Sequence, residues 1–176
     1  MTPVAGGSHA GWGTANYLVG LGPDSYLEIV GPDTGQPAPA QPRPFGIDEL
    51  ESARLVTWAV HPDDLDATVE RARRDGYDPG PPRPMSRRTP EGDELAWRLT
   101  PARGLLPFLI DWGSTPHPAS RGLPAVALES LALRHPEPSL IERQLAVLGV
   151  VRTVDAGDRQ QLVAVLRTPG GRLHLG

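Results

Sequence analysis

The chain has 176 residues, a formal net charge of −4 and no cysteine, which excludes disulfides, thiolate nucleophiles and cysteine-bound zinc. Its 17 basic residues are all arginine and are spread along the sequence, so no clustered basic face indicates nucleic-acid binding. No apolar run reaches bilayer length, and residues 1–13 lack the basic and apolar regions of a secretory signal. We therefore expect a cytoplasmic protein packed as one domain, without nucleic-acid or membrane partners.

The N-terminal part of the chain predicts strands and a connector. Two strands, at residues 12–21 and 25–30, are separated by a Gly-Pro-Asp turn, and a segment rich in Pro and Gly follows at residues 31–44. They resemble the back half of a repeating unit whose leading strand and helix would precede Met1. We expect residues 1–52 to form a partial first module made of strands plus this connector.

Two later segments repeat the same pattern of strand, Pro turn, helix and Gly. The first covers residues 54–74 and stops at Gly76, and the second covers residues 127–148 and stops at Gly149. The acidic start and arginine-rich end of the first helix suit the helix dipole. In the second helix, Ser139 and Glu142 have the spacing of a capping box. Both helices are therefore predicted from their ends as well as from their apolar stripes.

Strand patterns follow each helix, so the recurring unit is βαβββ and the fold class is α+β. These strands are predicted at residues 94–100 and 105–112 after the first helix, and at residues 151–154, 161–168 and 172–175 after the second. We expect residues 53–118 to form a complete βαβββ module and residues 119–176 to form a second one.

Several local patterns resemble the glyoxalase-like domain proteins of the vicinal oxygen chelate superfamily, which also contains the glyoxalase, bleomycin-resistance and dioxygenase groups. They are Gly7 to Asn16, Tyr26 to Val30, Thr57 to Asp66, Met85 to Arg87, Trp97 to Leu99 and Leu106 to Gly113. The resemblance covers nearly the whole chain. It implies paired βαβββ modules that form a curved, cup-like mixed sheet with helices outside and a small-molecule site inside the cup.

The same resemblance raises the question of a metal, because enzymes of that superfamily hold a divalent cation with a His and a carboxylate from each module. Glu28 stands at the first carboxylate position, but Leu55 and Ser130 stand at the two later His positions and Ile110 at the second carboxylate position. One carboxylate holds a hard cation weakly. We therefore predict no metal and no cofactor, although a one-residue shift in this alignment would turn Asp111 inward.

Aromatic and polar strand residues are the candidate ligand contacts. The four tryptophans are Trp12, Trp58, Trp97 and Trp112, and each either fills the core or lines the ligand site. Asn16, on an inward strand position, either satisfies a neighbouring backbone group or contacts a ligand. His9 lies in the Gly-rich approach to that strand, as either a surface residue or a site residue. His117 lies in a Pro-rich loop that could close over the cup.

Glu28 is the best candidate for a catalytic role, because a carboxylate on an inner strand face must be paired, hydrogen-bonded or shifted upward in pKa. It would act as a general base. The alternative is a structural ion pair with Arg87 or Arg98, either of which could instead bind a ligand carboxylate. Ser86 has no His and Asp arrangement around it in the sequence, so it is expected to contact ligand without acting as a nucleophile.

These residues predict a protein that binds a small molecule in a Trp-lined pocket. It would be a lyase or isomerase acting on a small carbonyl or carboxylate compound. The alternative is a non-catalytic protein that sequesters its ligand, as antibiotic-resistance proteins of the same superfamily do, and the sequence leaves open whether the protein is an enzyme. A sheet that begins at its second strand has an unpaired edge, so a homodimer is also expected.

Overall fold

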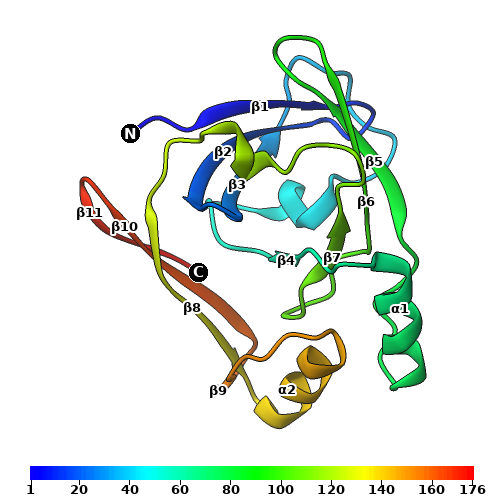
Figure 1. The fold of residues 1–176 in the computed structure, drawn as a ribbon. Coiled ribbons are helices and arrows are strands. Elements are labelled where there is room, and N and C mark those ends of the chain that lie inside the picture. The colour runs from blue at the N-terminus through cyan, green and yellow to red at the C-terminus, as the bar shows by residue number, and fades with distance from the viewer.

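A computed structural model describes all 176 residues. Its strands are β1 (Val4–His9), β2 (Thr14–Gly22), β3 (Ser25–Pro32), β4 (Ala59–Val60), β5 (Arg83–Arg88), β6 (Glu94–Leu99), β7 (Phe108–Asp111), β8 (Ala127–His135), β9 (Asp155–Ala156), β10 (Gln161–Thr168) and β11 (Gly171–Leu175). Its helices are α1 (Leu65–Arg74) and α2 (Pro138–Val147), with short 3-10 helices η1 (Pro44–Glu49) and η2 (Pro118–Arg121). The protein is an α+β fold (Figure 1).

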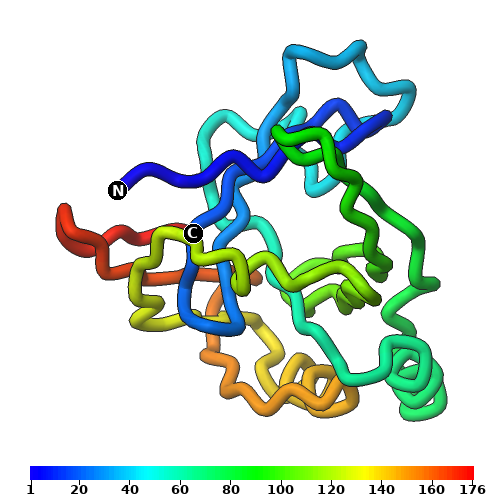
Figure 2. Tube along the Cα trace, turned by 45° about the horizontal axis from the view of Figure 1, so that its top comes forward, coloured from blue at the N-terminus to red at the C-terminus, as the bar shows by residue number.

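The larger sheet has seven strands in the order β3-β2-β1-β5-β6-β7-β4. All neighbours are antiparallel except β4 and β7, which are parallel. The two halves of the sheet meet where β1 pairs with β5, at Ser8 opposite Arg88. Figure 2 shows this junction, where the N-terminal segment runs beside the β5–β6 hairpin. The site residues come from strands on both sides of this junction.

The sheet is strongly curled, and the expected cup-like arrangement with helices outside is confirmed. Tyr26 on β3 and Trp112 directly after β7 lie far apart in the strand order, yet their ring centroids are 6.5 Å apart. The curl therefore brings both ends of the sheet together over its inner face. On the outer face, the apolar stripe of α1, represented by Leu65 and Val69, packs against Leu109 of β7.

The C-terminal segment forms a separate four-stranded sheet in the order β11-β10-β8-β9. Helix α2 packs on it through Leu145, which is fully buried in a cluster that also contains Leu105, Leu133 and Leu162. Because Leu105 precedes β7, this cluster ties the second sheet to the first. Neither helix has the length and apolar composition that crossing a lipid bilayer requires.

The N-terminal cap of α1 agrees with the sequence-based prediction, whereas that of α2 does not. The Asp64 side chain caps α1 by accepting a hydrogen bond from the Ala67 N–H, as its acidic start indicates. The capping box predicted for α2 is wrong. That helix begins at Pro138 without a side-chain cap, and the Glu142 carboxylate instead accepts a hydrogen bond from the Val154 N–H.

Several strand predictions also need correction. Strands β1 and β5 were not predicted, so the N-terminal half-unit has three strands instead of two. Strand β1 is Gly-rich and carries a register shift between Ala5 and Gly7, which hides its alternation. The strand predicted over residues 54–60 forms only at Ala59–Val60, and the one predicted over residues 151–154 forms at Asp155–Ala156.

Candidate functional site

The inner face of the seven-stranded sheet brings together residues from five successive strands. Strand register places Leu18 opposite Glu28, His9 opposite Thr14, and Met85 opposite Trp97. Since side chains alternate between faces along a strand, one polar and one aromatic group of side chains share the inner wall. The seven predicted site residues on this wall are His9, Asn16, Glu28, Arg87, Trp97, Trp112 and His117.

A polar network surrounds the Glu28 carboxylate. The Asn16 amide donates a hydrogen bond of 2.5 Å from Nδ2 to Glu28 Oε1, and His9 Nε2 lies 3.8 Å from the same oxygen. The other ring nitrogen of His9 is 2.9 Å from Thr14 Oγ1. The Glu28 side chain keeps 35% of its surface exposed, while His9, Asn16 and Thr14 are buried. Buried groups thus orient a carboxylate that solvent and ligands can reach.

The ring of His9 is held in its neutral form. Burial lowers the pKa of His9 below its usual value, against the attraction of Glu28, which raises it, and the nearby guanidinium of Arg87 lowers it further. A neutral imidazole can exchange protons with its surroundings in either direction. His9 and Glu28 therefore form a pair of proton-accepting groups side by side.

Arg87 is the most unusual member of the wall. It is only 3% exposed, its side chain takes part in none of the hydrogen bonds or ion pairs within the chain, and its Nε is buried without a partner. Burial lowers the pKa of Arg87, partly offset by the negative charge of Glu28. The ion pair between Arg87 and Glu28 that the sequence suggested is not formed. A buried cation without a partner is costly.

Four aromatic rings continue the wall beyond Arg87. Trp97 and Trp112 pack with ring centroids 5.2 Å apart, and Trp97 also meets His9 edge-on at 6.1 Å. The rings of Tyr26 and His117 both contact Trp112 and complete the group. Burial raises the pKa of Tyr26 well above its usual range, so its hydroxyl stays protonated. This aromatic cluster of Tyr26, Trp97, Trp112 and His117 adjoins the polar network, because Trp97 contacts His9.

Three of the four buried side-chain atoms that lack any hydrogen-bond partner lie on this wall: Asn16 Oδ1, Arg87 Nε and Trp112 Nε1. Buried polar atoms are nearly always paired, so their concentration on one surface points to a ligand contact. Gly6 makes room for the side chains of Asn16 and Arg87, because a Cβ at this position would collide with Asn16 Oδ1 and would lie 2.6 Å from Arg87 Nη1.

Four predicted site residues lie elsewhere. Trp12 is 38% exposed in the turn after β1. Trp58 packs beside the C-terminal core cluster and donates from Nε1 to the Leu105 carbonyl. Ser86 alternates with Arg87 on β5 and so faces outward. Arg98 lies on the outer face, where it pairs with Asp66 of α1 and with Asp111.

Sequence reasoning did not select Tyr26, Thr14 or Gly6 as site residues. Tyr26 and Thr14 had a usable signal, since Tyr26 lies two positions before Glu28 and Thr14 two positions before Asn16, on the same strand faces. Gly6 had none, because its role depends on the approach of Asn16 and Arg87 from two neighbouring strands.

The donors on the inner wall do not fit a tightly held divalent cation. Glu28, His9 and His117 are the side chains there of a type that binds such ions, but no group of three or more His, Asp or Glu side chains in the chain is close enough to hold one. Asp111 points outward to Arg98, and Ile110 takes the inner position. A divalent cation bound here would keep most of its coordination sphere as water.

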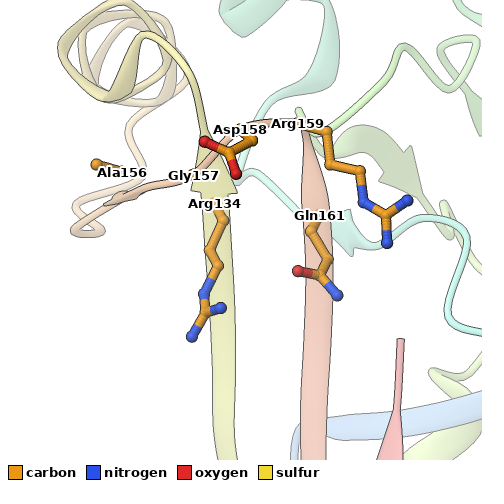
Figure 3. Close-up of a pocket in the computed structure, with 6 residues that line it drawn as sticks. All are labelled: Arg134, Ala156, Gly157, Asp158, Arg159 and Gln161. Atoms are coloured by element: carbon orange, nitrogen blue, oxygen red, sulfur yellow. The ribbon is translucent and has the colours of Figure 1, made fainter.

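Two surface hollows lie outside the cup. One, of about 610 Å³, is lined by Arg134, Ala156, Gly157, Asp158, Arg159 and Gln161 (Figure 3). In Figure 3, Arg134 and Gln161 extend along neighbouring strands while Arg159 points away. None of the lining residues is buried. The other, of about 360 Å³, lies beside the start of α1. Neither hollow contains one of the unpaired buried atoms.

Comparison with known proteins identifies a family and a similar fold. The profile of a family described as a glyoxalase-like domain matches residues 1–149. The crystal structure of a hypothetical protein from Staphylococcus aureus is similar with a TM-score of 0.64 and 11% sequence identity, over 100% of this chain and 90% of that one. At this identity the likeness concerns the fold alone. A comparison with curated proteins gave no match.

Proposed function

Because the chain belongs to the glyoxalase-like domain family of the vicinal oxygen chelate superfamily, we propose that the inner wall of its cup binds a small molecule that carries a carboxylate or a carbonyl oxygen. The observation that carries this proposal is Arg87, a guanidinium that is 97% buried and has no partner within the protein. A ligand oxygen would compensate this charge, and a carboxylate could do so with two parallel hydrogen bonds.

The other unpaired atoms extend this recognition. Trp112 Nε1 is a second donor and Asn16 Oδ1 is an acceptor. Together with Arg87 they suit a ligand that has two acceptor oxygens and one donor, with an apolar part against Trp97 and Trp112. Small-molecule sites commonly combine an apolar wall with a few polar groups of this kind.

In the proposed reaction, Glu28 acts as a general base. It would take a proton from a carbon next to the ligand carbonyl, and the electron pair of the broken C–H bond would pass to the carbonyl oxygen as an enolate. The positive charge of Arg87 would stabilise that oxygen. Returning the proton to a different position completes an isomerisation, whereas loss of a leaving group completes a lyase reaction. Asn16 holds Glu28 in place for either outcome.

Binding is tested with phenylpyruvate, which has a carboxylate, a carbonyl group and an aromatic ring, by calorimetry and tryptophan fluorescence. The R87Q variant should bind roughly 10- to 150-fold more weakly, since a hydrogen bond to a charged group contributes about 1.5–3 kcal/mol. The matched control is R88Q, whose exposed arginine lies next along β5 on the opposite face. Equal affinities in R87Q and R88Q would refute the role of Arg87.

Catalysis is tested separately from binding. In D2O, the protein should accelerate exchange of the carbon-bound protons of phenylpyruvate, observed by NMR, and E28Q should abolish that acceleration while still binding. A sequestering protein is the second candidate, favoured by the aromatic cluster beside the polar network. In that case the wild type and E28Q would both bind phenylpyruvate, and neither would accelerate proton exchange.

A homodimer is a further part of this proposal. Strand β3 ends the order of the larger sheet and has a partner only on its β2 side, and free sheet edges recruit other strands. A second copy of the chain would pair along β3. Light scattering distinguishes the mass of a monomer from that of a dimer, and a monomer at all concentrations tested would remove the dimer from the proposal.

A further inference from the structure

His117 enters the aromatic cluster from the loop after β7, which Thr115 ties to β6 through hydrogen bonds with the Ala96 backbone. The segment Gly113–Gly122 follows β7 and includes η2, and both terminal glycines have positive φ, at 53° and 69°. Within it, His117 Nδ1 accepts a hydrogen bond from the Ala119 N–H. The ring is thus fixed within its own loop, while its contacts with the sheet are aromatic.

The His117 ring is held by two ring contacts. It meets Tyr26 edge-on at 5.5 Å and Trp112 at 6.0 Å with an interplanar angle of 87°. Burial, followed by the nearby His61, lowers the pKa of His117, while Asp24 raises it. A neutral imidazole that contacts two aromatic side chains resembles a small planar ligand ring.

The contact leaves one polar group unsatisfied. Trp112 Nε1 is buried and has no hydrogen-bond partner even with His117 beside it. The imidazole therefore fills space next to Trp112 without meeting its hydrogen-bonding requirement. A larger ring that carries an acceptor would fill this space and also accept a hydrogen bond from Trp112 Nε1.

From these contacts we infer that His117 occupies the position of the ligand's ring, and that the ligand is a planar aromatic acid which displaces it. Trp97 connects this position to the anion end, because it contacts Trp112 on one side and His9 on the other. His9 adjoins Arg87 across the β1–β5 junction. Tyr26, which contacts His117, is also close enough to Glu28 and Arg87 for their charges to affect its pKa. This inference rests on the proposed function, which supplies Arg87 as the anchor.

Competition between His117 and the ligand follows directly. Each ring excludes the other from the position beside Tyr26 and Trp112, so part of the ligand's binding free energy is needed to displace the His117 ring. Removing the imidazole should tighten the binding of aromatic acids. It should leave acids without a ring unaffected, because these reach Arg87 without entering the aromatic cluster.

The test uses H117N, which keeps an oxygen acceptor for the Ala119 N–H and removes the ring. H135N is the matched control, because His135 also precedes a proline and also accepts, at Nδ1, from the N–H two residues later. Phenylacetate and acetate are the probes, measured by calorimetry. H117N should bind phenylacetate about two- to ten-fold more tightly than the wild type does, the equivalent of an aromatic contact. Acetate affinity should be unchanged, as should both affinities in H135N.

Added imidazole provides a second readout. It should compete with phenylacetate in H117N by entering the space left by the ring, and should not compete in H135N. Unchanged or weaker phenylacetate binding by H117N, with R87Q still impaired, would overturn the inference and leave the proposed function standing. Absence of binding by the wild-type protein, or binding that R87Q and R88Q share equally, would overturn both.

Discussion

Replacing Gly6 with alanine tests the close packing beneath the polar network. The new Cβ would collide with Asn16 Oδ1 and lie 2.6 Å from Arg87 Nη1. Both contacts involve the ends of side chains, but Asn16 is 2% and Arg87 3% exposed, so neither can move into solvent. Moving Asn16 also breaks its hydrogen bond to Glu28. Overpacking of this kind costs about 1–3 kcal/mol.

The control is G31A, because nothing lies within 4 Å of a Cβ at Gly31 and its φ is not in the left-handed region. For a chain of this length, about 2–4 °C of Tm corresponds to 1 kcal/mol, so G6A should lower Tm by roughly 2–12 °C. G31A should change it little. Thermal unfolding followed by tryptophan fluorescence measures both Tm values, and phenylpyruvate affinity should fall only in G6A. Equal midpoints for the two variants would show that Asn16 and Arg87 do not pack against Gly6.

Two further expectations concern stability. W58F removes the hydrogen bond from Trp58 Nε1 to the Leu105 carbonyl and should lower the free energy of unfolding in urea by about 1–2 kcal/mol without changing ligand affinity. The control W12F, at an exposed turn, should change it by less than about 0.5 kcal/mol. An equal loss in both variants would contradict the hydrogen bond assigned to Trp58. The lowered pKa of His9 means that the unfolded chain binds this proton more readily, so stability should be greatest above pH 6.5 and should decrease as the pH falls below it, by about 1.4 kcal/mol per unit of pKa difference. His9→Asn should reduce this pH dependence, and an unchanged slope would show that another group titrates.

The sequence alone determined the local features of this protein. Helical periodicity and the two stop glycines located α1 and α2, and the charged ends also located α1, because these signals act within a few residues. Strand alternation also placed Tyr26 and Glu28 on one face. The repeat of strand, turn and helix was recognisable for the same reason.

Only the tertiary structure decided which arginine and which tryptophans face the cup. Alternation relates a residue to its strand neighbours but does not say which face turns inward, so Arg87 and Arg98 were equivalent until β5 and β6 were paired and α1 covered one face. The meeting of Tyr26 with Trp112, and of Gly6 with Arg87, depends on curling of the whole sheet and on the β1–β5 junction. Contacts between distant strands arise from packing of the assembled sheet, and no local pattern encodes them.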